Sequence, residues 1–227
     1  MKKILAIQGS DLKNINIKTD TTILLAAEAQ KRGYSIYYFE PENLSFLNGK
    51  VIASCKHIKI HDNKKKFYSS IKAINFNLEK SNVILIRNDP PFNNRYLYST
   101  FLLNHISKKV KIINDPSAIR NVSEKLFSIN FMRYMPPTLI SENLKEIKNF
   151  FKKYKAIVAK PINGFSGNNV ILFKSFNASK IKKLLKIHNH LFFQKFLPGV
   201  YKGDKRVFII KGKRVSSIPG PPQKGST

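Results

Sequence analysis

Four short apolar runs, each followed by a polar loop, constrain the fold of this chain more than any other feature. The first two runs, residues 3–8 and 35–39, flank an alanine-rich helical segment at residues 23–32. Candidate N-caps at residues 19–21 precede this segment and Gly33 follows it, so both helix ends are marked. A strand, a helix and a strand in this order form a β–α–β unit, which predicts a parallel sheet. The other two runs, residues 83–86 and 111–113, flank a predicted helix over residues 96–107 and extend that sheet.

Polar residues follow two of these runs at the places where ligands of parallel sheets bind. The loop at residues 9–16 follows the first strand, and Arg87-Asn88-Asp89-Pro90-Pro91-Phe92 follows the buried strand at residues 83–86. Such sheets bind ligands at the carboxyl ends of their strands. Arg87 and Asp89 are therefore candidate site residues, and the alternative is an ion pair that only holds the turn.

The segments between these strands give less regular signals. Residues 44–60 alternate like a hairpin that turns at Asn48-Gly49. Residues 64–78 read as a helix or an irregular segment with a solvated basic face. A capping box at residues 121–124 predicts a helix with Lys125 in its first turn, where a cation opposes the helix dipole. Either Lys125 serves a ligand or it is an ordinary solvated lysine.

The second half of the chain carries a lysine beside a glycine-containing loop. Met135-Pro136-Pro137 predicts a linker, and a strand at residues 138–140 and two amphipathic helices, at about 144–151 and 181–188, are expected after it. Between the helices, residues 157–173 read as strand, loop and strand, with Lys160 at the end of the first strand. A lysine next to flexible glycines can hold a phosphate, although an ordinary hairpin fits the same pattern. Strands at residues 191–197 and 207–210, a turn at 211–213, a return strand from Val215 and a polar tail complete the chain.

The formal net charge of +28 has two explanations. One is nucleic-acid binding. The other is compositional drift in an AT-rich genome, which the excess of lysine over arginine and its even spread favour. The single cysteine, Cys55, excludes an intrachain disulfide and a cysteine-rich zinc site. Apolar runs stay well short of the ~20 residues that span a bilayer, and the first one is too short for a signal peptide, so a cytoplasmic protein is expected.

Seven motifs in this order resemble the bacterial glutathione synthetases, a branch of the ATP-grasp ligases. The resemblance covers essentially the whole chain, and its two most specific elements are Arg87–Phe92 and Gly203-Asp204-Lys205-Arg206. Asn88 departs from the family's usual Arg-Lys-Asp-Pro-Pro-Phe. The remaining motifs are residues 14–18, 114–116, 121–127, 159–167 and 194–197.

The resemblance implies an α/β fold of two parts. Residues 1–120 would form a parallel-sheet N-terminal, substrate-binding domain (the pre-ATP-grasp domain), and residues 121–227 an incomplete ATP-grasp α+β domain. Within the second part, a lid is expected at about 124–190 and the start of the C-terminal sheet at 191–227. The implied activity joins γ-glutamylcysteine to glycine with ATP and Mg²⁺, through an acyl phosphate. Small molecules would be the partners, with no specific nucleic acid and no membrane, and a homo-oligomer is compatible with the family.

Residue roles also follow from the resemblance. Arg206 would stabilise developing charge as the catalytic residue, and Asn16, Arg87 and Asp89 would bind the peptide substrate. The implied ATP-binding residues are Lys125, Lys160, Gly164, Phe165, Ser166, Gly167, Gln194, Lys195, Phe196, Leu197 and Asp204.

One departure from the family concerns the metal. In the family, the Mg²⁺ ligands are acidic and asparagine residues in a segment that would lie beyond Thr227. In this sequence no Asp or Glu follows Asp204. We therefore expect no metal ligands within these residues, weak ATP binding without completed ligation, and uncovered apolar sheet faces. The alternatives are another ATP-grasp carboxylate–amine ligase, a basic nucleic-acid-binding protein without ligase activity, and an inactive remnant.

Overall fold

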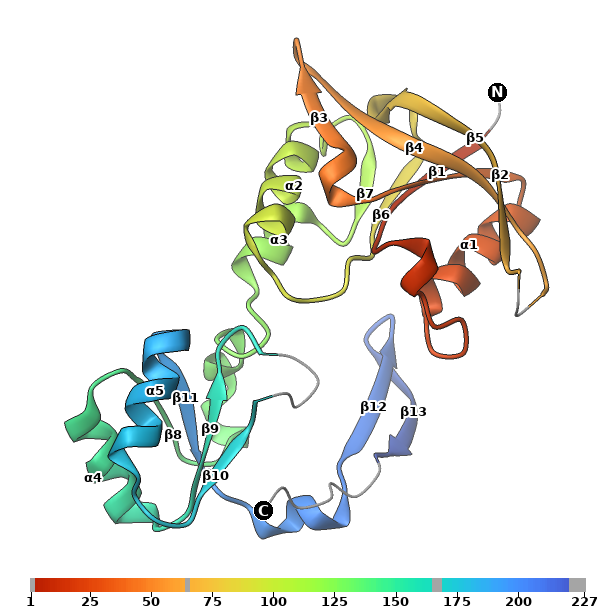
Figure 1. Cartoon of the computed structure of the whole chain (residues 1–227). Helices are drawn as coiled ribbons and strands as arrows, with labels where there is room; N and C mark the ends of the chain where they lie inside the picture. The colour runs from red at the N-terminus through yellow and green to blue at the C-terminus, as the bar shows by residue number, and fades with distance from the viewer. Residues whose placement is uncertain (1–2, 64–65, 165–168, 221–227) are drawn as a thin grey trace. The chain divides into compact units, whose positions relative to one another are not determined.

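The computed structural model describes residues 3–63, 66–164 and 169–220. The chain divides into two compact units, residues 1–123 and residues 124–227 (Figure 1). Both units combine helices with sheets, so the predicted α/β class is confirmed.

A seven-stranded sheet forms the centre of the first unit. Strand β1 (Lys3–Gln8) pairs in parallel with β2 (Tyr34–Phe39) on one side and with β6 (Val83–Ile86) on the other. Strand β7 (Lys111–Ile113) adds to β6, also in parallel, so the predicted parallel sheet is confirmed over these four strands. The full strand order is β3-β4-β2-β1-β6-β7, with β5 paired to β4.

Three antiparallel strands widen this sheet beyond the sequence prediction. Strands β3 (Leu44–Leu47) and β4 (Lys50–Ile60) form the expected hairpin, in which Asn48 and Gly49 both have positive φ. The expectation of a helix or irregular segment at residues 64–78 is wrong, because β5 (Tyr68–Asn77) pairs antiparallel with β4. Most side chains of β5 are exposed or half-buried, so its sequence lacks the alternation that marks a strand with one buried face.

Helices cover both faces of the sheet because successive side chains of a strand point to opposite faces. Helix α1 (Thr21–Lys31) begins at the N-cap Asp20, and its Ile23 and Ala26 pack with Leu5 and Ile7 of β1. On the other face, helix α2 (Asn94–His105) packs with Ala6, Ile84 and Ile86. Helix α3 (Pro116–Asn121) lies beside α2.

The expected capping-box helix at residues 121–124 is wrong. Asp115 accepts a hydrogen bond from the Ala118 amide and caps α3, which ends at Asn121. Residues 124–126 form a turn and Phe127–Tyr134 a 3₁₀ segment, so Lys125 lies in a turn. The stronger cap, an aspartate followed by a proline at the first helical position, starts the helix six residues earlier.

A four-stranded antiparallel sheet forms the centre of the second unit, in the order β10-β9-β11-β8. Its strands are β8 (Thr138–Ser141), β9 (Ile157–Pro161), β10 (Ile171–Phe173) and β11 (Leu191–Lys195). Helices α4 (Leu144–Tyr154) and α5 (Ala178–His188) bury Ile147 and Ile181 against one face of it. Strand β11, which we expected to open a C-terminal sheet, therefore belongs to the same sheet as the lid strands.

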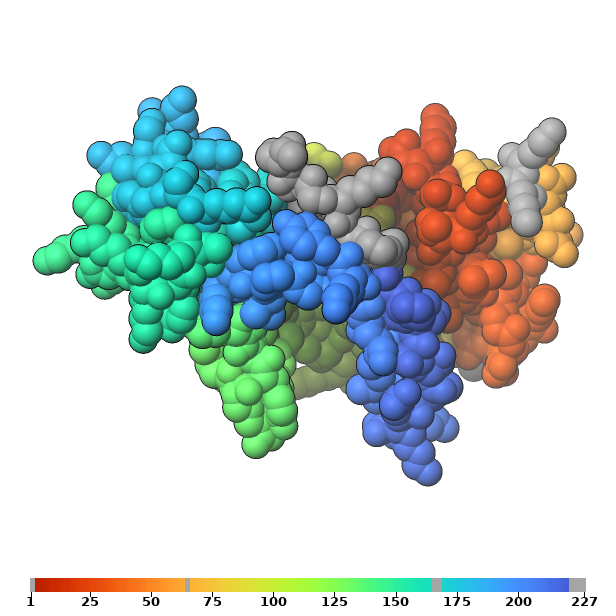
Figure 2. All heavy atoms as spheres, turned by 90° about the horizontal axis from the view of Figure 1, so that it is seen from below, coloured from red at the N-terminus to blue at the C-terminus, as the bar shows by residue number. Residues whose placement is uncertain are grey.

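The last two described strands stand apart from that sheet. Strands β12 (Lys205–Ile210) and β13 (Lys213–Pro219) pair only with each other among the described residues, and their atoms form a protrusion in dark blue in Figure 2. Apolar side chains on both strands are exposed, namely Val207, Phe208, Ile209, Ile210, Val215 and Ile218. None of the helices in the described ranges is long and apolar enough to cross a membrane.

Candidate functional site

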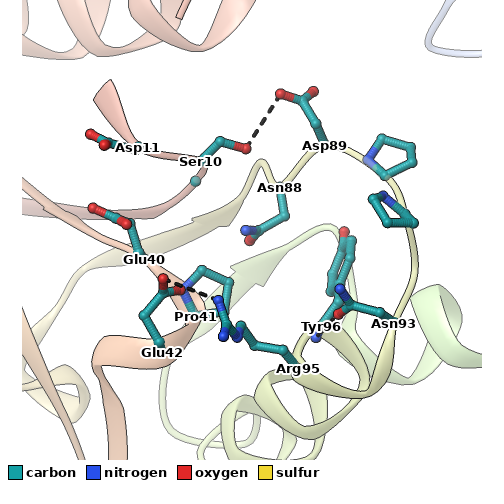
Figure 3. Close-up of a pocket in the computed structure, with 13 residues that line it drawn as sticks. Ser10, Asp11, Glu40, Pro41, Glu42, Asn88, Asp89, Asn93, Arg95 and Tyr96 are labelled. Carbon is teal, nitrogen blue, oxygen red and sulfur yellow. Dashed lines mark hydrogen bonds and ion pairs between the residues drawn. The ribbon is translucent and has the colours of Figure 1, made fainter. Parts of the chain in front are cut away.

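A pocket of about 300 Å³ opens at the carboxyl ends of β1, β2 and β6 in the first unit (Figure 3). Its lining joins the loop after β1 (residues 9–11), the segment after β2 (residues 40–42), the loop after β6 (residues 88–91) and the start of α2. This is the edge at which ligands of parallel sheets bind. The predicted substrate residue Asp89 lines it, and Ser10 lies beside Asp89 with a hydroxyl-to-carboxylate distance of 3.4 Å.

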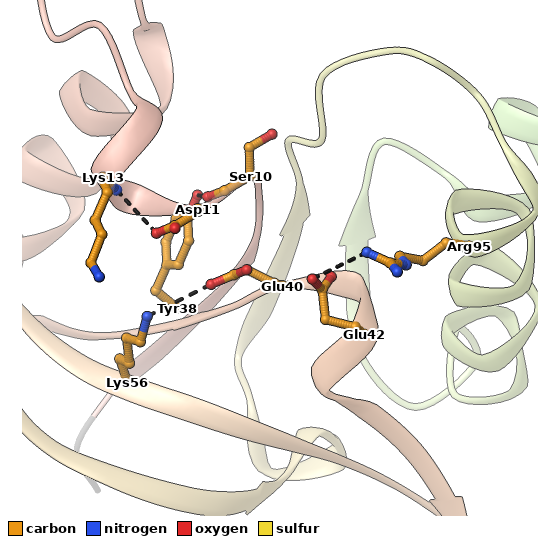
Figure 4. Close-up of polar contacts among 8 residues, drawn as sticks. All are labelled: Ser10, Asp11, Lys13, Tyr38, Glu40, Glu42, Lys56 and Arg95. Atoms are coloured by element: carbon orange, nitrogen blue, oxygen red, sulfur yellow. Dashed lines mark hydrogen bonds and ion pairs between the residues drawn. The ribbon is translucent and has the colours of Figure 1, made fainter.

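Carboxylates dominate the polar lining of this pocket. Asp11, Glu40, Glu42 and Asp89 face it together with one guanidinium, that of Arg95. Arg95 lies 3.3 Å from Glu42, and Lys56 lies 3.6 Å from Glu40 (Figure 4). These pairs leave Asp11 and Asp89 without an ion pair among the described residues, so the pocket favours a cationic group.

A tyrosine supports the loop that forms one wall of the pocket. Tyr38 is buried and donates a hydrogen bond of 2.6 Å to the Ser10 carbonyl, and burial raises the pKa of its hydroxyl. A Cβ at Gly9 would clash with the Tyr38 hydroxyl oxygen. Only glycine lets the chain pass this close to the ring, which explains the residue at position 9.

Two of the predicted substrate residues lie outside the pocket lining. Arg87 precedes Asn88 and points toward the start of α1, where its Nε and Nη2 donate to Thr22 and Thr21 at 3.2 and 2.8 Å. Among the described residues it makes no ion pair, so the turn-holding pair with Asp89 is not formed. Asn16 is exposed, and its side chain accepts from the Lys18 amide within its own loop.

Two of the predicted ATP residues of the second unit, Lys160 and Gln194, lie on the face of the four-stranded sheet opposite α4 and α5. Ile157 and Ala159 of β9 pack under the helices, so the alternate residue Lys160 points to the other face. There Lys160 Nζ donates to Gln194 Oε1 on β11 at 2.8 Å. Gln194 Nε2 in turn donates to Thr138 Oγ1 on β8 at 3.0 Å, which links three neighbouring strands.

A second lysine adds its charge to this face. Lys125 Nζ donates to the Gly164 carbonyl at the start of the glycine loop. Burial, and then the positive charge of Lys125, lower the pKa of Lys160. Neither lysine forms an ion pair with a carboxylate in the described ranges. Two cations near one another, without a counter-ion among the described residues, attract an anion.

The other predicted residues of this unit lie at its periphery. The backbone after Gln194 is fixed by hydrogen bonds, from the Lys195 amide to Pro137 and from the Phe196 amide to Ala156, and Leu197 is exposed. Asp204 accepts a backbone hydrogen bond from Gly220, and Arg206 is exposed on β12. The structure does not show either of them in contact with Lys125 or Lys160. Phe165, Ser166 and Gly167 lie outside the described residues.

Several residues at these sites escaped the sequence prediction. Glu40 follows β2 at its carboxyl end, so the rule that selected Asp89 would also have found it once the strand order was known. Arg95 and Tyr96 come from α2 and gave no local signal. Thr138 is an ordinary residue of a strand by sequence, and only the pairing of β8 with β11 places it beside Gln194.

A metal site is not evident in the parts of the chain that the structure describes. No group of three or more His, Cys, Asp or Glu side chains there could hold a metal ion. The groups around Lys160 include two ammonium groups, which attract phosphate oxygens and repel Mg²⁺.

Comparisons with known proteins agree with these features. The model for the N-terminal domain of prokaryotic glutathione synthetase matches residues 3–120, and the model for the ATP-grasp domain of that enzyme matches residues 124–227. The glutathione synthetase of Mesorhizobium japonicum is 34% identical over 223 residues, which cover 96% of this chain and 71% of that protein. That of Escherichia coli O6:H1 is 34% identical over 229 residues, covering 98% and 72%.

Solved structures show the same fold at low identity. The D-cycloserine synthetase DcsG aligns with a TM-score of 0.63 and 14% identity, covering 96% of this chain and 68% of its own. The ATP-grasp ligase PsnB, in a complex with a precursor peptide and AMPPNP, aligns with a TM-score of 0.55 and 17% identity, covering 96% and 72%. The matched domain models and the curated relatives show that this chain belongs to the prokaryotic glutathione synthetase family of ATP-dependent carboxylate–amine ligases.

Proposed function

We propose that this chain binds ATP through Lys125 and Lys160 and uses it to activate the carboxylate of γ-glutamylcysteine for attack by glycine. The observation that carries the proposal is a pair of lysines without carboxylate partners among the described residues: Lys160, partly buried on the open face of the four-stranded sheet, and Lys125, whose charge acts on it. A buried cation that lacks a counter-ion destabilises the empty site, and the phosphates of a nucleotide would remove that cost.

The chain's own residues would act on the nucleotide in separate ways. Lys160 and Lys125 would neutralise phosphate charge as cations that are already in position. The glycine loop that begins at Gly164 would cover the phosphates and keep water from the acyl phosphate. Backbone groups of residues 194–197 would contact the base, and Asp204 and Arg206 would border the phosphates and the reacting carboxylate. Mg²⁺, which the family uses, would shield phosphate charge when bound, and we assign it no ligands here.

The peptide substrate fits the carboxyl edge of the seven-stranded sheet. γ-Glutamylcysteine carries an ammonium and carboxylate groups, and this edge offers the carboxylate of Asp89 and the guanidinium of Arg87 on the loop after β6. We assign the ammonium to the carboxylates of the pocket and a substrate carboxylate to Arg87. Asn16 would contribute from the loop after β1.

Titration of ATP into the full chain tests the nucleotide site. Lys125→Met and Lys160→Met should each weaken ATP binding by about tenfold or more, because a hydrogen bond to a charged group is worth about 1.5–3 kcal/mol. Lys183→Met is the matched control: it removes one positive charge from the exposed surface of α5 and should leave the affinity unchanged. If all three substitutions lowered the ATP affinity equally, the affinity would depend only on the net charge of the protein. The nucleotide site would then not lie at Lys125 and Lys160.

Steady-state assays of ADP release test the peptide site. With γ-glutamylcysteine and glycine present, Arg87→Met and Asp89→Asn should raise the KM for γ-glutamylcysteine and leave the KM for ATP nearly unchanged. The reverse pattern would contradict the assignment. ADP release that does not depend on γ-glutamylcysteine would contradict the ligase reaction itself.

A further inference from the structure

A hydrogen-bonded chain crosses three strands and ends on one of the two lysines. Thr138 Oγ1 on β8 donates a hydrogen bond to the Pro136 carbonyl at 2.8 Å and accepts one from Gln194 Nε2 at 3.0 Å. Gln194 on β11 then presents Oε1 to Lys160 Nζ on β9 at 2.8 Å. Gln194 is 7% exposed, so its amide has few other partners to choose from.

The direction of each hydrogen bond between Thr138, Gln194 and Lys160 is fixed. A threonine hydroxyl has a single proton, and Thr138 uses it on a carbonyl that can only accept. Its oxygen can therefore only accept from Gln194, which places the amide nitrogen toward β8 and the amide oxygen toward β9. Lys160 requires the same orientation of the Gln194 amide, because an ammonium has three donors and no acceptor and can bond only to the amide oxygen. The two ends of the glutamine agree, and neither tolerates the flipped amide.

We propose that Thr138 is a positioning residue for nucleotide binding, acting through Gln194 to hold the ammonium of Lys160 toward the phosphates. The inference rests on the proposed nucleotide site and extends it by a residue on a strand that does not itself carry either lysine. Lysine has four rotatable bonds, and a fixed acceptor reduces the freedom that is lost when the ammonium binds a phosphate. Without the threonine hydroxyl, the glutamine amide can rotate and its nitrogen can face the ammonium.

The test compares three substitutions at position 138 in the full chain, with ATP affinity as the readout. Thr138→Val keeps the branched shape and removes the hydroxyl, and should weaken ATP binding about fivefold. Thr138→Ser keeps the hydroxyl and should stay within about twofold of the wild type. Thr138→Ala should match the valine variant if the hydroxyl matters and the methyl group does not. Equal affinity of the wild-type and valine proteins would overturn the proposal.

A double substitution separates positioning from general damage to the strand. Gln194→Leu removes the amide, so adding Thr138→Val to it should cause no further loss of ATP affinity. A further loss of the same size would show that Thr138 acts by another route and would overturn the proposal. The pH at which ATP affinity falls should also move downward in Thr138→Val, because the charged lysine loses its fixed acceptor, whereas damage to folding alone would leave that pH unchanged.

Lys160→Met, measured in the same series, keeps the two proposals distinguishable. If Lys160→Met leaves ATP affinity intact, the nucleotide site itself is wrong. If Lys160→Met weakens binding and Thr138→Val does not, only the role of Thr138 fails. Should the valine variant not fold, Gln194→Leu alone decides: it must reproduce a loss of about fivefold, and unchanged affinity would overturn the proposal.

Discussion

Lys160 is held in a protonation state that its surroundings oppose. Burial is the main cause of its lowered pKa and the charge of Lys125 the second. The folded protein therefore carries a penalty for the charged lysine that is fully present below the lowered pKa and disappears as the pH rises through that pKa toward the ordinary value of 10.5. The negative charge of an anion bound to both lysines would offset both causes, so binding and protonation of Lys160 would support each other.

The pH dependence of ATP affinity follows from this linkage. Above about pH 8, where the phosphates are fully ionised, affinity should fall as Lys160 loses its proton, at a pH below the ordinary lysine value of 10.5. In Lys125→Met the overall affinity should be lower, but the fall should move to higher pH because one of the two causes is removed. Calorimetric titrations at several pH values measure both midpoints.

Lys183→Met, on the exposed surface of α5, should follow the wild-type pH profile. A midpoint that is the same in the wild type and in Lys125→Met would show that the two charges do not interact.

Helix α1 links a residue-level cap to the candidate peptide site. Asp20 Oδ1 accepts from the Thr22 amide at 2.5 Å, and the hydroxyls of Thr21 and Thr22 hold Arg87. The first turn of α1 thus both completes the helix and orients a guanidinium at the end of β6. Loss of the cap should therefore destabilise the first turn of α1 and weaken the orientation of the Arg87 guanidinium.

Substitution of the cap tests its contribution to stability. Asp20→Ala should lower the free energy of unfolding by about 1 kcal/mol, since it leaves the first-turn amides of α1 without a side-chain acceptor. Asp20→Asn keeps an acceptor oxygen and should cost only a few tenths of a kcal/mol. Urea denaturation followed by circular dichroism measures both. If the asparagine variant lost as much stability as the alanine variant, the negative charge rather than the hydrogen bond would be the stabilising feature.

Elements with strong local signals could be predicted from the sequence, and elements set by their neighbours could not. The hairpin at Asn48-Gly49 and helix α1 carry their own turn and cap residues. Strand β5 has mostly exposed or half-buried side chains and exists because β4 offers an edge to pair with. The capping box at residues 121–124 does not begin a helix, because Asp115 caps α3 six residues earlier and that helix ends at Asn121.

The candidate sites divide in the same way. Asp89 and Lys160 could be found because each ends a recognisable strand, where ligands of sheets bind. Glu40, Arg95 and Thr138 needed the strand order and the cross-strand pairs, which no local pattern contains. The distinction between Arg87, which donates to the start of α1, and Asp89, which lines the pocket, also needed the three-dimensional arrangement.

At the scale of the whole molecule, acidic groups are scarce and unevenly placed. The chain has 13 of them against 41 lysines and arginines, and four line one pocket. The ion pairs of the described residues all involve partly or well-exposed side chains, which contribute little to stability. Most lysines therefore remain uncompensated, and their mutual repulsion should weaken as salt screens it.

This charge leads to the prediction that distinguishes a ligase from a nucleic-acid-binding protein. At low salt the chain should bind any oligonucleotide, because phosphates attract a molecule with a net charge of +28 whatever their sequence. Raising the salt to ~0.15 M should remove most of this binding, since each phosphate contact releases counter-ions and the affinity falls steeply with salt. Fluorescence anisotropy with oligonucleotides of different sequence, each at several salt concentrations, measures it. Tight binding of one sequence at ~0.15 M salt would contradict the expectation, because direct contacts to bases, unlike phosphate contacts, depend on sequence and persist when the charges are screened.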